Sequence, residues 1–174
     1  DGGALLTRDE ALFGLLKSLA VHGEGESRYE YARIGMNSRL DTMQAAVLLS
    51  KLEVFSEEID GRNAAAQRYA EGFGDVVRPH KVIEGGRSVW AQYTIEVDDR
   101  DGFRASLQEK GVPTAVYYPI PLHEQPPYQR FTTAPGGLPV TERAAKRVVS
   151  LPMDGYLNGE RQDRVIDAVR AALA

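Results

Sequence analysis

The chain has 174 residues, 43% of them hydrophobic and 26% charged, which is the composition of a folded globular protein able to bury a core. Its 25 acidic and 21 basic residues give a net charge of −4, so no broad attraction to nucleic acid or an anionic membrane is expected. Cysteine is absent, which excludes disulfides and thiolate chemistry. No apolar run approaches the roughly 20 residues that span a bilayer and no signal peptide is visible, so we expect no membrane insertion and a cytoplasmic location.

The first elements predicted are a strand and a helix. Leu5 and Leu6 follow two glycines and read as a strand. Residues 7–10 then form T-x-x-E, a capping box that predicts a helix beginning at Thr7. The helix should end before the polar loop that contains Gly23.

Residues 41–73 have the spacing of one long amphipathic helix. Asp41 can cap its N-terminus, Gln44 can reach back to that cap, and apolar residues recur at helical spacing over about nine turns. Gly61 costs about 1 kcal/mol relative to alanine in the middle of a helix. A break near Asp60 and Gly61 into two helices therefore stays open.

Shorter elements follow from Val76 onwards. Residues 88–97 alternate apolar and polar side chains, which predicts a strand, and Asp101 should cap a helix that ends at Gly111. The remaining pattern predicts a strand at residues 114–120, a long loop at 123–139 and a helix at 141–149. A short extended piece at 150–153 and a final helix at 159–173 follow. Sequential mixed elements of this kind indicate an α/β protein.

Several common active-site motifs are absent. The sequence contains no G-x-S-x-G and no glycine-rich phosphate loop with its lysine. The three histidines, His22, His80 and His123, lack metal-ligand spacing, so no metal site is expected. No self-contained active site is visible.

Two loops nevertheless concentrate polar residues. In "GMNSRLDTMQ", Asn37 and Arg39 lie just before a helix N-terminus, a location that favours phosphate or carboxylate. The alternative, which the pattern alone favours, is that Asn37 serves a turn and Arg39 is a solvated surface charge.

The second loop, "YYPIPLHEQPPY", combines prolines, which stiffen a loop, with tyrosines, which offer a flat face and a hydroxyl. It could line a ligand pocket. Equally, Tyr117 or Tyr118 could point into the core and His123 could be an ordinary loop residue. Trp90 is predicted to pack in the core or at an interface.

These loops and the long helix carry a resemblance to a known family. The stretches "GGALLT", "RIGMNSRLDTMQAAVLLSKLEVF", "PTAVYYPIPLHEQPPY" and "SLPM" resemble the C-terminal half of DegT/StrS-type sugar-nucleotide aminotransferases. That family implies the aspartate-aminotransferase fold (type I PLP fold), pyridoxal 5′-phosphate as cofactor and a homodimer with shared active sites. These stretches are most similar to the sequences of enzymes that aminate UDP-2-acetamido-2-deoxy-3-oxo-glucuronate for bacterial polysaccharide or O-antigen synthesis. The resemblance implies glutamate as the amino donor.

The resemblance assigns roles to residues. Asn37 matches an asparagine that reaches the cofactor phosphate of the other subunit. Arg39 matches a position that faces the substrate, where its guanidinium group could bind a carboxylate through two hydrogen bonds. Tyr118 matches a pocket tyrosine near the sugar, with Tyr117 beside it. His123 is expected to orient the loop or meet the sugar nucleotide.

The same resemblance implies that the Schiff-base lysine lies upstream of Asp1. The lysines of this chain do not match the family's motif: Lys17, Lys51, Lys81, Lys110 and Lys146. Transamination needs such an amine to exchange the aldehyde and shuttle the proton, so this chain alone is expected to be inactive.

The expected organisation has three parts. They are a remnant of the cofactor-binding large domain at residues 1–40, a long connecting helix or helix pair at 41–74, and a small C-terminal α+β domain at 75–174. Two alternatives stay open: a stand-alone, non-catalytic α+β binding module, and an aminotransferase for a 4-keto sugar nucleotide.

Overall fold

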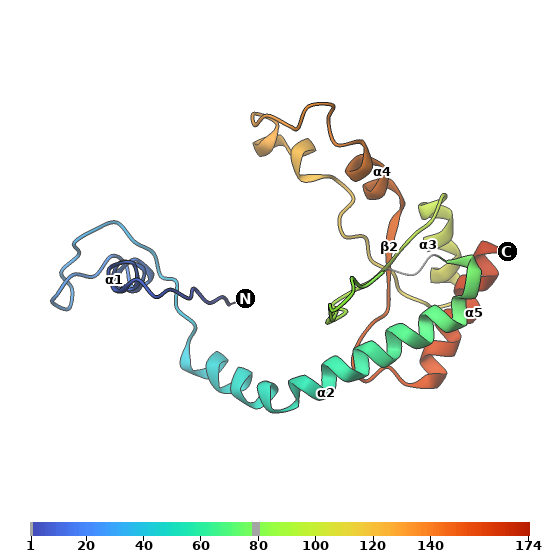
Figure 1. Ribbon diagram of the computed structural model, residues 1–174, viewed down its shortest axis with the longest axis horizontal. Coiled ribbons are helices and arrows are strands. Elements are labelled where there is room, and N and C mark those ends of the chain that lie inside the picture. Colours follow the sequence, from blue (N-terminus) through green and yellow to red (C-terminus); the bar gives the residue numbers. More distant parts are fainter. Residues whose placement is uncertain (1, 78–80) are drawn as a thin grey trace. The chain divides into compact units, whose positions relative to one another are not determined.

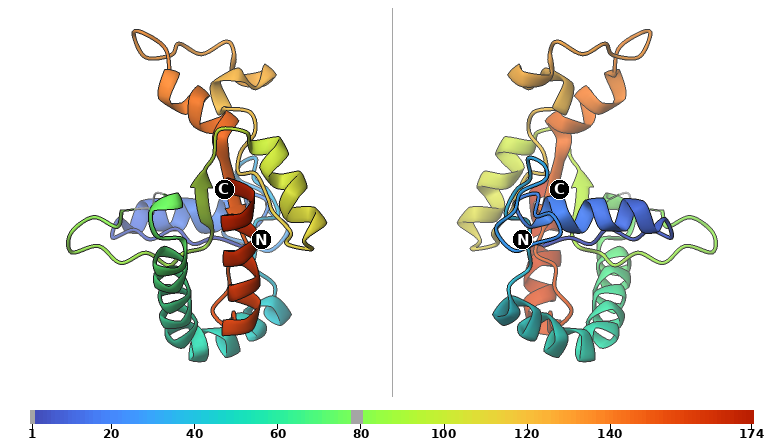
Figure 2. Two further views of the ribbon diagram at one scale, coloured as in Figure 1. Left: turned by 90° about the vertical axis from the view of Figure 1, so that its right-hand side faces the viewer. Right: turned by 90° about the vertical axis from the view of Figure 1, so that its left-hand side faces the viewer.

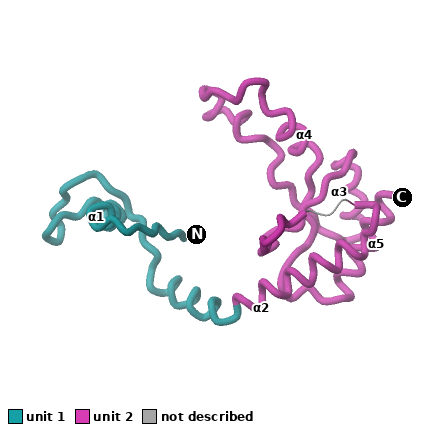
Figure 3. Tube along the Cα trace, in the orientation of Figure 1, with its two compact units in different colours: residues 1–54 teal, residues 55–174 magenta. Residues whose placement is uncertain are grey.

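The computed structural model describes residues 2–77 and 81–174 (Figure 1). The chain divides into two compact units, Asp1–Val54 and Phe55–Ala174, and the boundary lies inside one helix (Figure 3). We call these parts unit 1 and unit 2. No helix in the described part of the chain is both long and apolar enough to cross a bilayer.

Unit 1 begins with an irregular segment and helix α1 (Glu10–Ala20). The N-cap is Asp9, whose Oδ1 accepts a hydrogen bond from the Leu12 amide at 3.0 Å, so the prediction of a cap at Thr7 is wrong by two residues. Thr7 instead accepts a hydrogen bond from the Asp9 amide at 3.1 Å. The predicted strand around Leu5 and Leu6 is also wrong, since a strand requires a paired neighbour and no backbone hydrogen bond joins residues 2–6 to another described segment.

Helix α2 (Thr42–Phe73) is continuous. As predicted, Asp41 caps it, with its Oδ1 accepting a hydrogen bond from the Gln44 amide at 2.8 Å. The alternative of a break at Gly61 is wrong. A Cβ at Gly61 would lie 2.0 Å from the carbonyl oxygen of Gly155, so the glycine is present because another backbone segment crosses the helix there.

The core of unit 2 surrounds an antiparallel strand pair. Strand β1 (Tyr93–Glu96) pairs with β2 (Val148–Leu151), with Tyr93 opposite Leu151. Helices α3 (Arg100–Glu109) and α5 (Gly159–Leu173) pack together beside this pair (Figure 2). As the alternation predicted, the side chains of Tyr93, Ile95 and Val97 are buried.

Strand β1 is shorter than the predicted strand at residues 88–97. Two side chains of α2 bind the backbone before it: Arg62 donates to the Trp90 carbonyl at 3.0 Å and Asn63 donates to the Ser88 carbonyl at 3.0 Å. Trp90 itself has a positive φ of 44°. The carbonyl groups of Ser88 and Trp90 therefore bind side chains of α2, and the hydrogen-bonded pairing of β1 with β2 does not extend to these residues.

Other boundaries differ by a few residues. Asp99, and not Asp101, caps α3 by accepting a hydrogen bond from the Gly102 amide at 3.0 Å. The predicted strand at residues 114–120 is reduced to one bridge between Ala115 and Ser150. Helix α4 (Pro139–Arg147) ends before the two valines that the sequence pattern assigned to it, and these begin β2.

The described residues of unit 2 also form three short 3₁₀ turns: η1 (Gly74–Val76), η2 (Leu122–Glu124) and η3 (Pro126–Tyr128). Most of η2 and all of η3 lie in residues 123–139, which the sequence predicts to be a loop. Helix α5 has the predicted bounds, and Val165, Ile166 and Val169 are buried on its inner side.

An aromatic cluster joins α2 to β1. The ring centroids of Tyr69 and Phe73 are 5.2 Å apart, and those of Tyr69 and Tyr93 are 5.0 Å apart. The Tyr69 hydroxyl donates to the Pro152 carbonyl at 2.8 Å. Burial raises the pKa of this hydroxyl well above its usual range, so it stays a neutral donor.

The Gly61 crossing can be tested by Gly61→Ala. Alanine gains about 1 kcal/mol of helix propensity, yet the clash with the Gly155 carbonyl should lower the free energy of unfolding by about 2 kcal/mol. Chemical denaturation measures the difference. Gly14→Ala in α1 is the control, because open space surrounds that position and stability should be kept or raised; equal behaviour of the two variants would contradict the interpretation.

Candidate functional site

Asn37 is held by backbone contacts to the end of α1. The Met36 amide donates to the Leu19 carbonyl and the Ser38 amide donates to the Ala20 carbonyl, both at 2.9 Å. Asn37 forms an isolated antiparallel bridge with Val21. Asn37 therefore lies in a paired, extended segment, and the alternative that it serves a turn is wrong.

Asn37 and Arg39 form a hydrogen-bonded pair. Arg39 Nε donates to Asn37 Oδ1 at 3.1 Å. The amide NH₂ is the donor end of this side chain, so it is the group that Asn37 would offer to an anionic ligand. Within the described residues no carboxylate forms a salt bridge with Arg39, and the residue is exposed.

Both side chains line an open hollow of about 760 Å³ within unit 1, and Lys17 of α1 also lines it. An amide NH₂, a guanidinium and an ammonium group are all hydrogen-bond donors, and two of them are cations. This donor set suits a phosphate or a carboxylate. The donors are thus compatible with the roles that the resemblance implies, a cofactor phosphate for Asn37 and a substrate carboxylate for Arg39, and these roles stay predictions.

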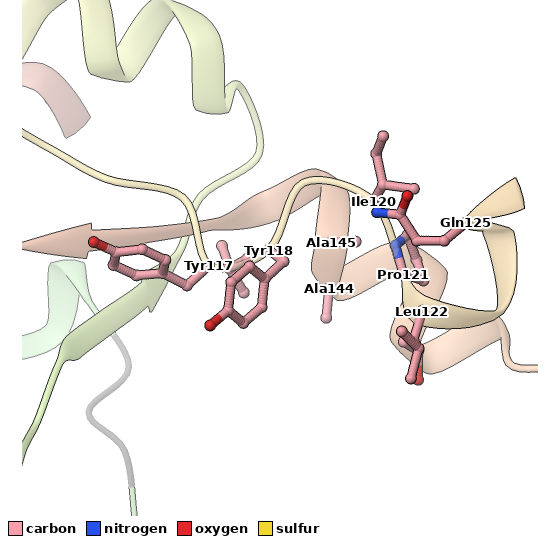
Figure 4. A pocket seen from close by; sticks show the side chains of 10 residues that line it. Tyr117, Tyr118, Ile120, Pro121, Leu122, Gln125, Ala144 and Ala145 are labelled. Atoms are coloured by element: carbon pink, nitrogen blue, oxygen red, sulfur yellow. The ribbon is translucent and has the colours of Figure 1, made fainter. Parts of the chain in front are cut away.

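The tyrosine loop, which we define as residues 117–131, lines a hollow of unit 2 together with α4. The hollow has a volume of about 490 Å³ and mostly apolar walls. Figure 4 shows Tyr117 and Tyr118 at one end of it and Pro121 and Leu122 at the other. The tyrosine side chains are 44% and 71% exposed, so the alternative that either one fills the core is wrong.

His123 lies in η2 and contacts α4. Its Nε2 is 3.2 Å from Glu142 Oε1. Ligand atoms of His123, Glu124 and Glu142 all lie within 4.8 Å of one another. The sequence did not reveal this cluster, because Glu142 follows 19 residues later on another element.

The other histidines and Trp90 lie elsewhere. His22 follows α1 in unit 1, and His80 lies outside the described residues. Trp90 packs against the core, where its ring centroid is 5.5 Å from that of Tyr93 and its Nε1 donates to Asn63 Oδ1 at 3.2 Å. The predicted packing role of Trp90 is confirmed, while the absence of a metal site stays a prediction.

The sequence matches the DegT/DnrJ/EryC1/StrS aminotransferase family over residues 1–170. The chain belongs to this family. It is 46% identical over 159 residues to UDP-2-acetamido-2-deoxy-3-oxo-D-glucuronate aminotransferase from Pseudomonas aeruginosa, covering 91% of this chain and 43% of that protein. It therefore spans less than half of that relative's length.

Solved structures of this family also superpose on the chain. A DegT/DnrJ/EryC1/StrS aminotransferase from Brucella abortus superposes with a TM-score of 0.89 at 48% identity, covering 95% of this chain and 44% of that one. NtdA from Bacillus subtilis with bound cofactor PMP superposes with a TM-score of 0.77 at 29% identity, covering 90% of this chain and 38% of that one. The resemblance read from the sequence and the expected type I PLP fold class are confirmed.

The family also confirms the expected cofactor, since its aminotransferases depend on pyridoxal 5′-phosphate. The individual roles of Asn37, Arg39, Tyr117, Tyr118 and His123 stay predictions.

If Tyr118 serves a ligand and not the core, Tyr118→Ala should change the free energy of unfolding by no more than about 0.5 kcal/mol, because the ring is exposed. Tyr93→Ala is the contrasting variant and should cost about 3 kcal/mol or more, because that ring is buried. Urea denaturation measures both. A large loss of stability in Tyr118→Ala would assign the ring to packing.

Proposed function

We propose that this chain is the C-terminal part of a PLP-dependent aminotransferase that acts on a keto sugar nucleotide. The proposed substrate is UDP-2-acetamido-2-deoxy-3-oxo-glucuronate, the proposed amino donor is glutamate, and the product would serve bacterial polysaccharide or O-antigen synthesis. The observation that carries the proposal is the Asn37–Arg39 pair in an open, donor-rich hollow. The 46% identity to the P. aeruginosa enzyme supports the choice of substrate.

Each candidate residue has a role in this proposal. The Asn37 amide would hold the cofactor phosphate, and the Arg39 guanidinium would bind the uronate carboxylate through two parallel hydrogen bonds. Tyr117 and Tyr118 would place aromatic faces and hydroxyls against the sugar nucleotide, with His123 holding the loop or contacting the ligand. When bound, pyridoxal phosphate supplies the carbonyl group and the electron sink that transamination needs.

A second subunit is part of the proposal. The N-terminal half of α2 exposes several apolar side chains, of which Met43, Leu49 and Leu52 are 82%, 67% and 63% exposed. Soluble proteins rarely expose contiguous apolar patches of large area, so this surface supports burial against a further protein surface, either the rest of the same subunit or a second subunit. We propose a homodimer in which each active site uses Asn37 and Arg39 of the partner.

The proposed domain division follows the same relationship: large-domain residues 1–40, a connecting helix at 41–74 and a small domain at 75–174. In this proposal no lysine of this chain forms the Schiff base with pyridoxal phosphate. The chain alone is therefore proposed to be inactive, with its Schiff-base lysine upstream of Asp1.

The role of Arg39 can be tested with Arg39→Ala in the full-length protein. Losing charge-assisted hydrogen bonds to a carboxylate costs about 1.5–3 kcal/mol, so KM for the 3-keto uronate should rise at least tenfold. A neutral keto sugar nucleotide should be affected much less. Arg143→Ala is the control, because Arg143 is an exposed arginine to which no role in binding is assigned. Equal effects on charged and neutral substrates would remove the carboxylate assignment and favour another sugar, including a 4-keto sugar.

The position of the cofactor-bound lysine can be tested by borohydride reduction of the full-length protein loaded with pyridoxal phosphate. Reduction fixes the cofactor to its lysine, which peptide mass spectrometry then locates. The modified residue should lie upstream of Asp1. Labelling of Lys17 or another lysine of this chain would overturn the proposal, and an absence of pyridoxal absorbance would favour a non-catalytic binding module.

A further inference from the structure

The tyrosine loop is attached to the rest of unit 2 by very few polar contacts. The hydrogen bonds within residues 117–131 are local, such as the Glu124 amide to the Pro121 carbonyl at 3.0 Å and Gln129 Nε2 to the Glu124 carbonyl at 3.0 Å. Among the described residues, one hydrogen bond joins this loop to another element. It connects His123 Nε2 to Glu142 Oε1 at 3.2 Å.

The chemistry of this contact assigns the donor and the acceptor. An ionised carboxylate can only accept hydrogen bonds, so Nε2 of His123 must carry the proton and donate it. The His123 side chain is 19% exposed and the Glu142 side chain is 41% exposed. The contact is therefore partly shielded from water, and Glu142 sets both the orientation of the ring and the nitrogen that carries the proton.

The contact also joins two segments that line the hollow in unit 2. Glu142 lies on α4 between Thr141 and Ala144, which both line the hollow. His123 directly follows Leu122, the residue of the tyrosine loop that lines the same hollow. Among the described residues, loss of this hydrogen bond would leave no hydrogen bond between the tyrosine loop and α4.

Glu124 offers an internal comparison. Its carboxylate belongs to the same cluster within 4.8 Å, but no side-chain hydrogen bond from it to His123 is formed among the described residues. A metal-binding cluster would use Glu124 and Glu142 in equivalent ways. A hydrogen-bonded clamp would depend on Glu142 alone.

We propose that Glu142 is a positioning residue: through His123 it holds the tyrosine loop against α4 and so sets the shape of the pocket for the sugar nucleotide. The part of this inference that concerns the sugar rests on the proposed function. The part that concerns the loop rests on the structure of unit 2 alone.

Amide hydrogen exchange in the full-length protein tests the clamp without any need for activity. Glu142→Ala should raise exchange in residues 117–131 about five- to tenfold, the effect expected from losing one hydrogen bond. Glu142→Gln should stay close to wild type, because its amide oxygen accepts from the same Nε2–H. Glu124→Ala should also leave exchange unchanged, and His123→Ala combined with Glu142→Ala should equal either single variant.

Unchanged exchange in Glu142→Ala, or an equal increase in Glu124→Ala, would overturn the clamp. Thermal denaturation of each variant separates a local effect from global destabilisation, and the proposal requires a loop-restricted change.

Steady-state kinetics tests the link to the sugar. Glu142→Ala should raise KM for the sugar nucleotide about fivefold with kcat nearly unchanged, and Glu142→Gln should restore KM. A loss of kcat alone, or no rescue by glutamine, would contradict the positioning role. If the wild-type protein has no aminotransferase activity, the proposed function fails, while hydrogen exchange still decides whether Glu142 holds the loop.

Discussion

The contact between the C-terminal half of α2 and the segment that follows β2 is the constraint on which unit 2 depends. At Gly61 the two backbones approach so closely that only a glycine fits. Further along α2, Tyr69 stacks on Phe73 and binds the Pro152 carbonyl. Since β2 leads directly from α4, this contact also fixes the base from which α4 and the tyrosine loop extend.

Local signals in the sequence were sufficient for most helices. The spacing of apolar residues located α2 and α5. Asp41 was correctly identified as an N-cap because its carboxylate accepts a hydrogen bond from an amide only three residues away in the sequence. The errors at α1 and α3 have one cause. Each helix begins near two residues able to cap it, and the choice between Thr7 and Asp9 depends on backbone angles that the sequence pattern does not contain.

Features set by distant residues could not be predicted. Strand β1 starts late because Arg62 and Asn63 bind the preceding backbone across 28 and 25 residues of sequence. The same applies to the candidate sites. Asn37 and Arg39 lie two residues apart and were found from their position before a helix, whereas the partner of His123 lies on a separate helix and has no local signature.

The hydrogen bond between Arg39 and Asn37 has an entropic consequence. A long arginine side chain normally loses rotamer freedom when it captures an anion, at a cost of roughly 0.5–1.5 kcal/mol. Here Nε is already engaged by the neighbouring amide, which restrains the guanidinium plane before any ligand arrives. Both side chains are thus preorganised, and more of the intrinsic attraction between the guanidinium and an anion is available as affinity.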